Sequence, residues 1–145
     1  MMVHDDTCRL LGECDAGIQM AIRSIDEVLP LVESTHLRQQ LSNCRRAHEH
    51  LRTETHSLLG RYEAEGKTPG PMANGMRWLR TNVRLAVQPG DQSVADLMID
   101  GCNTGIKALH RYCNRCPDAS PDARALAGRL IDEERRLQRD LQSYL

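Results

Sequence analysis

The stretch "LRQQLSNCRRAHEHLRTETHSLLGRY", Leu37 to Tyr62, carries the longest helical pattern in this chain of 145 residues. Ser34 and Thr35 precede it, and such residues cap helix N-termini. It is followed by "EGKTPGP" (65–71), where Gly and Pro cannot continue a helix. We therefore predict one long amphipathic helix between these breaks. Its inward face, read from the steps of three and four residues, holds Leu37, Leu41, Cys44, His48, Leu51, Thr55, Leu58 and Tyr62.

The same period predicts a further long helix before this stretch, and two long helices and one short helix after it. "CPDASP" (116–121) is a turn with a capping Ser120 and with Pro121 at the first helical position. The turns at 30–34 and 117–120 are short, whereas the connection from 65 to 91 is long enough to carry the chain along a whole bundle, as in ferritin-type crossovers. The apolar stripes of these helices run over 11–29, 72–87, 94–112 and 126–141.

The composition favours packed helices over strands. Aromatic residues make up 3% of the chain and Phe is absent, so the core must consist of Leu, Ile, Val, Met, Ala and Cys. Strands favour the aromatic and β-branched residues that are scarce here. We predict a single all-α domain over residues 1–145.

Charge and hydropathy narrow the classes of partner. The net charge is −1, whereas a general nucleic-acid binder is usually far more basic. No apolar run approaches the length that spans a bilayer, and the N-terminal residues lack the pattern of a secretory signal. We expect a cytoplasmic protein with six reduced cysteines and without nucleic-acid or membrane partners.

Three polar residues, Asp15, His48 and Glu134, interrupt the apolar stripes. Asp15 lies 14 residues before Leu29 and His48 lies 13 after Thr35, so an antiparallel hairpin places them level. The same count places Glu134 level with Cys102. We predict that all four meet near the middle of the bundle, with Cys44 one helical turn from His48 (positions 15, 44, 48, 102 and 134).

Two interpretations fit such a cluster. A single metal ion such as zinc, held by Asp15, Cys44, His48 and Glu134, would compensate the cost of burying polar groups. Alternatively, the carboxylates of Asp15 and Glu134 accept hydrogen bonds from His48 and nearby donors in a self-satisfied network. A lone core histidine belongs more often to such a network, which we favour.

Several segments, taken in order, carry a resemblance to a known family over Cys14–Leu141. They resemble bacterial ferritin-like four-helix bundles of the domain-of-unknown-function class, in the rubrerythrin/ferritin-like superfamily. The resemblance implies a long crossover that contains the short helix, between the second and third long helices, and no established activity. The segments are "CDAGIQMA", "AHEHL", "GPMANGMRWL", "ADLMIDGCNTGIKALHRY" and "RLIDEERRLQRDL".

The resemblance also implies positions for di-iron ligands, which are a Glu from two helices and a Glu-x-x-His from each of the others. Asp15 matches the first Glu, and the first Glu-x-x-His becomes Arg45-x-x-His48. The third helix offers Cys102 or Asn103 instead of Glu, and the second Glu-x-x-His becomes Glu134-x-x-Leu137. The matching positions are 15, 45, 48, 102 or 103, 134 and 137. At most half of the set survives, so a di-iron centre is not expected, while self-association is expected by analogy of fold.

The pair Cys113-x-x-Cys116 falls at a helix C-terminus, where the helix dipole opposes the thiolate, so redox catalysis is not expected. A ferritin-type crossover brings this end close to His4 and Cys8. Zinc binding there is an alternative to ordinary helix-end packing, which we favour.

Two further patterns have structural explanations that we prefer. Gly101 and Gly105 lie four apart, which predicts close helix packing. Arg77, Arg80 and Arg84 share one face of the short helix and fit a solvated surface better than an anion or partner site.

Motifs of nucleophiles, phosphate loops and dinucleotide sites are absent from the sequence. We therefore predict a non-enzymatic binding or structural protein whose polar core cluster replaces a di-iron site. The alternative is a mononuclear zinc or iron protein that uses the same cluster.

Overall fold

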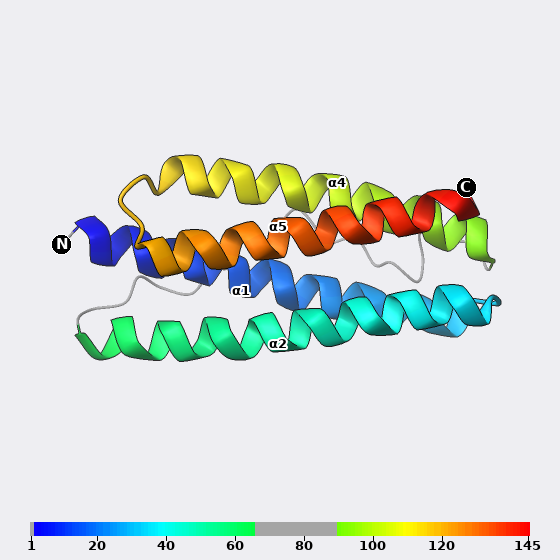
Figure 1. The fold of residues 1–145 in the computed structure, drawn as a ribbon, viewed down its shortest axis with the longest axis horizontal. Coiled ribbons are helices and arrows are strands. Elements are labelled where there is room, and N and C mark those ends of the chain that lie inside the picture. Colours follow the sequence, from blue (N-terminus) through cyan, green and yellow to red (C-terminus); the bar gives the residue numbers. More distant parts are fainter. Residues whose placement is uncertain (1, 66–89) are drawn as a thin grey trace.

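The computed structural model describes residues 2–65 and 90–145 and shows them as an elongated bundle of helices lying side by side (Figure 1). These residues form helices and no strand, which confirms the all-α prediction. The predicted short helix (72–87), with Arg77, Arg80 and Arg84, lies outside the described residues. The elements are α1 (Met2–Val28), the 3-10 turn η1 (Leu29–Leu31), α2 (Thr35–Glu65), α4 (Asp91–Arg115), α5 (Pro121–Leu141) and the 3-10 turn η3 (Gln142–Tyr144).

Hydrogen bonds to two side chains, Asp91 and Thr7, show how the helices are oriented relative to one another. At one end, the Asp91 carboxylate accepts the backbone N–H groups of Glu33 at 2.8 Å and Ser34 at 3.0 Å, so α2 and α4 begin together. At the other end, the N–H of Ser120 donates to Thr7 Oγ1 at 2.8 Å, so α5 begins beside the start of α1. The α1–α2 and α4–α5 hairpins therefore pack with α2 and α4 running in the same direction (Figure 1).

Local chemistry explains the helix starts. The Ser120 side chain accepts the N–H of Ala123 at 3.3 Å, and Pro121 occupies the first helical position, as the sequence predicts. Gly90 precedes α4 with φ of 119°, a conformation that L side chains rarely adopt and glycine tolerates.

The core divides into two apolar clusters along the bundle. On α2, His48 lies between Leu51 of the first core cluster and Cys44 of the second. On α5, Glu134 occupies the corresponding place, after Ile131 and before Leu137. The first core cluster includes Leu10, Leu11, Ile18, Leu126 and Leu130, and the second includes Ile25, Val28, Leu37, Leu41 and Leu141.

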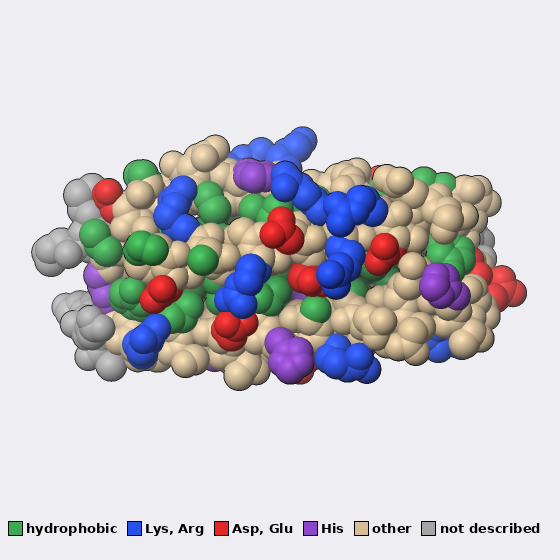
Figure 2. Space-filling view, viewed as in Figure 1, with side chains coloured by type: hydrophobic (Ala, Val, Ile, Leu, Met, Phe, Trp, Pro, Cys, Tyr) green, Lys and Arg blue, Asp and Glu red, His purple; other side chains and the backbone are tan. Residues whose placement is uncertain are grey.

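The outer surface carries interleaved charges of both signs over α2 and α5 (Figure 2). Exposed ion pairs link neighbouring helices, such as Arg45–Asp26 at 2.7 Å and Arg129–Glu54 at 2.9 Å. Exposed pairs of this kind contribute about 0–1 kcal/mol each. Among the helices of residues 2–65 and 90–145, none is long and apolar enough to cross a membrane.

Candidate functional site

The boundary between the two core clusters holds a polar layer, formed by Cys44, His48, Cys102 and Glu134. The His48 side chain is fully buried, and its Nε2 lies 3.9 Å from Glu134 Oε2. The Cys102 thiol donates to the same oxygen at 3.7 Å. The predicted level of Cys102 and Glu134 is therefore confirmed, as is the inward position of His48.

His48 is oriented by its own helix. Its Nδ1 lies 2.8 Å from the carbonyl oxygen of Cys44, and since a carbonyl only accepts, Nδ1 carries a proton. Its Nε2 has no hydrogen-bond partner among the described residues, because 3.9 Å to Glu134 exceeds hydrogen-bond length. The predicted network, with His48 donating to Asp15 and Glu134, is not formed. A buried polar atom without a partner costs about 1–3 kcal/mol.

Burial governs the ionisation of the polar layer. It raises the pKa of Glu134, and the neighbouring His48 and the Cys102 hydrogen bond only partly oppose this. Burial also raises the pKa of the Cys44 and Cys102 thiols, and the charge of Glu134 raises them further. Both thiols are therefore protonated at neutral pH, which makes them poor nucleophiles.

Asp15 does not join the polar layer, so its predicted depth is wrong. Its Oδ1 lies 2.7 Å from His56 Nε2, and its Oδ2 accepts from Gln19 at 2.7 Å. His56 lies eight residues, about two helical turns, beyond His48. It is half exposed yet paired, rather than simply solvated.

The error in depth comes from the path of the first turn. Counting from the turn assumes that α2 begins level with the end of α1. Asp26, near the end of α1, instead pairs with Arg45, ten residues into α2. The start of α2 thus extends past the end of α1, and every α1 residue meets a later α2 residue than predicted.

The structure brings together three of the four predicted metal ligands. Cys44, His48 and Glu134 come together, but Asp15 is held by His56 elsewhere. Within residues 2–65 and 90–145, no group of three or more His, Cys, Asp or Glu side chains is arranged to hold a metal ion. Arg45, which the resemblance aligns with a di-iron ligand, points outward to Asp26.

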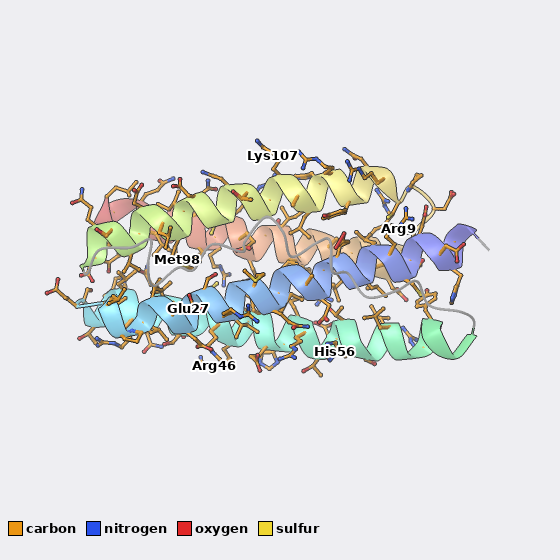
Figure 3. The ribbon with its side chains drawn as sticks, turned by 180° about the vertical axis from the view of Figure 1, so that it is seen from behind. Arg9, Glu27, Arg46, His56, Met98 and Lys107 are labelled. Carbon is orange, nitrogen blue, oxygen red and sulfur yellow. The ribbon has the colours of Figure 1, made fainter. Side chains whose placement is uncertain are left out.

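A cavity of about 180 Å³ opens beside the polar layer, between α1 and α4. Its floor includes the buried Cys44, Cys102 and Glu134, and its rim includes the exposed Asp100 and Thr104. Met98, on the side of α4 that faces α1, also lines it (Figure 3). The sequence analysis did not predict this cavity.

Gly101 forms part of the cavity wall, and the close helix packing predicted for it is not observed. A Cβ atom built at Gly101 meets no atom of the described residues within 4 Å, so this glycine leaves open space and does not permit a close contact with another described helix. The signal available in the sequence was a mid-helix glycine beside Cys102, which we interpreted as packing.

The end of α4 lies beside the start of α1, as predicted. The N–H of Asp118 donates to Asp6 at 2.9 Å, and Cys116 and Cys14 are completely buried in the first core cluster. Burial raises the pKa of Cys113 and Cys116. His110, on the last turns of α4, accepts a hydrogen bond from Arg135 at 3.3 Å.

Comparisons of the chain with protein-family models, with curated proteins and with solved structures found no match. The functional inference therefore starts from the polar layer and the cavity.

Proposed function

We propose that this protein is a ferritin-like bundle that binds a small molecule in the cavity between α1 and α4, without catalysing a reaction on it. The observation that carries the proposal is the cavity of about 180 Å³ with the buried carboxyl of Glu134 in its floor. An apolar core cavity of about 150 Å³ accommodates benzene. The space therefore suits a ligand of about that size with one polar group.

The ionisation of the cavity residues supports binding over nucleophilic catalysis. The cavity thiols, Cys44 and Cys102, have raised pKa values, and the reactive form of a cysteine is the thiolate. His48 holds its Nδ1 proton on a backbone carbonyl, and it stands behind Glu134 instead of lining the cavity. It is therefore placed to support Glu134 and not to contact a ligand.

The topology supports the ferritin-like part of the proposal. The second and third long helices run in the same direction, which requires a long crossover, as in ferritin-like folds. In such bundles, ligand sites are built from side chains of facing helices in the core. The polar layer occupies that position here, with two thiols in place of carboxylates.

Calorimetric titration with benzyl alcohol tests the proposal, because this probe combines a ring of suitable size with one hydroxyl group. We expect saturable binding to the wild type and a loss of binding in Gly101→Leu, whose side chain enters the cavity. Gly128→Leu is the matched control. It makes the same change at a helical, half-buried glycine with nothing within 4 Å, and Gly128 does not line the cavity.

Both variants replace a helical glycine by a good helix former, so both should fold. Equal binding to the wild type and to Gly101→Leu would remove the cavity as the site. Absence of binding to the wild type would contradict the proposed function.

A further inference from the structure

We propose that the cavity selects a small primary amine, bound as its ammonium ion with the nitrogen against Glu134. This inference rests on the proposed function and names the chemical class of its ligand. It is carried by the charge of the cavity lining, by the unused hydrogen-bonding capacity of Glu134 and by the apolar character of the remaining wall.

The described residues that line the cavity include acids and no bases. Asp100 at the rim and Glu134 in the floor are carboxyl residues, and no lysine, arginine or histidine is among the described residues that line it. Ser24 and Thr104 add hydroxyl oxygens, which can accept hydrogen bonds. An anionic ligand would meet two carboxylates without a compensating cation, whereas a cation finds complementary charge at both rim and floor.

Glu134 has few partners for a buried carboxyl. Among residues 2–65 and 90–145, its Oε2 receives only the Cys102 thiol, a weak donor at 3.7 Å, and the Nε2 of His48 remains 3.9 Å away. A carboxylate offers about four lone-pair sites, so most of its accepting capacity is unused. The three N–H donors of an ammonium group match that capacity, and they supply the opposite charge that a buried carboxylate lacks.

The rest of the wall suits a short apolar group. Ala21 and Ile25 of α1 face Leu97 and Met98 of α4, and Leu137 closes the cavity from α5. An aliphatic or aromatic group of about benzene size fits such a volume. The geometry therefore separates a charged floor from an apolar wall, which is the arrangement that a small amphiphilic amine requires.

Paired calorimetric titrations of benzylamine and benzyl alcohol, which have the same shape and differ in charge, test the ligand class at neutral pH. We expect the wild type to bind benzylamine about tenfold or more tightly than benzyl alcohol, since a hydrogen bond to a charged group contributes about 1.5–3 kcal/mol. Glu134→Gln should remove this preference, because it deletes the negative charge and keeps the shape of the side chain. Asp100→Asn, at the exposed rim, should retain most of it.

A pH series on the wild type gives a second measurement that needs no substitution. Glu134 faces Cys44 and His48 of α2, Cys102 of α4 and the neighbouring Glu133, and the α1 wall adds no titratable group. Lowering the pH protonates Glu134, and because burial raises its pKa above 4.5, this happens at a higher pH than for an exposed carboxyl. The preference for benzylamine should then decline, while benzyl alcohol binding stays constant.

The outcomes separate the two proposals. If benzyl alcohol binds the wild type and not Gly101→Leu, but benzylamine binds no more tightly, the cavity stands and the amine inference is overturned. A benzylamine preference that persists both in Glu134→Gln and at low pH also overturns it, because Glu134 is then not the anchor. If neither probe binds, both proposals fail.

Discussion

Two acid–histidine pairs connect α2 to its neighbours, and they differ in almost every physical respect. His56 meets Asp15 of α1 at 2.7 Å, with 48% of the histidine side chain exposed. His48 faces Glu134 of α5 at 3.9 Å, and its side chain is completely buried. The exposed pair closes into a hydrogen bond, whereas the buried pair stays open.

The difference shows that the neighbouring groups, more than the residue types, decide whether an acid and a histidine form a hydrogen bond with each other. His56 is half exposed and turns its Nε2 to a carboxylate that Gln19 also holds. His48 is held through Nδ1 by the Cys44 carbonyl, which fixes its Nε2 short of Glu134. The open pair borders the cavity, so its unused bonding capacity is available to a ligand.

The largest expected effect comes from removing the two histidines in turn. His48→Ala should lower the free energy of unfolding by about 2–4 kcal/mol, because it deletes a fully buried side chain. His56→Ala should lower it by about 0–1 kcal/mol, as for other exposed pairs. Urea denaturation of both variants measures the contrast, and equal losses would contradict it.

His48→Asn sharpens the same comparison. The asparagine amide places an N–H near the position of Nδ1, and so retains a donor for the Cys44 carbonyl. We expect it to recover part of the stability lost in His48→Ala. Failure to recover any would mean that volume, and not the Nδ1 hydrogen bond, accounts for the whole effect of His48.

The next effect is a pH dependence that belongs to the buried pair. The folded pKa of Glu134 is raised above 4.5, so the folded protein holds this proton more tightly than the unfolded chain. Stability contributed by the protonated carboxyl is present below about pH 4.5 and is lost as the pH rises through the folded pKa. The wild type should therefore lose stability relative to Glu134→Gln over this range, by at most about 1.4 kcal/mol per pH unit.

Urea denaturation of both proteins from about pH 4 to about pH 8 measures this difference. Glu54→Gln controls for the substitution itself, because Glu54 is an exposed partner of Arg129 and its loss should cost about 0–1 kcal/mol. If the stability of the wild type relative to Glu134→Gln stays constant or increases as the pH rises, the raised pKa is contradicted.

The smallest effect concerns salt and the exposed pair. A double-mutant cycle with Asp15→Asn and His56→Gln should give a coupling energy of about 0.2–1 kcal/mol at about 0.1 M salt. The coupling should shrink at about 1 M salt, where the screening length falls to about 3 Å. A coupling of several kcal/mol, or one insensitive to salt, would show that this pair behaves like a buried one.

The sequence predicted the parts of the fold that depend on local pattern. The long helices of residues 2–65 and 90–145, the Ser120 cap and the inward face of α2 follow from periodicity and capping chemistry. The register of Glu134 with Cys102 was also predicted, because the turn between α4 and α5 joins the two helices directly. The register of Asp15 was predicted incorrectly, because the path of residues 29–34 shifts α2 along α1 by about two helical turns.

The cavity is harder to predict, because its lining residues come from four helices at once. Gly101 leaves space only because no side chain of α1 reaches it, and no pattern along one helix shows that. Likewise, the open distance between His48 and Glu134 depends on a backbone carbonyl, and so on the rotamer that α2 imposes. The apolar stripe along a helix predicts which residues face inward, but it does not predict the distances between their side chains.

The bonds that fasten the two hairpins have a consequence for the order of folding. Thr7 and Ser120 are separated by 113 residues, and Ser34 and Asp91 by 57, whereas contacts within each hairpin are more local. Closing long loops costs more entropy and slows the formation of such contacts. We expect each hairpin to assemble first and the two to dock last. The polar layer and the cavity lie between the hairpins, so the binding site forms only when the hairpins dock. A bound ligand should therefore slow the separation of the two hairpins during unfolding.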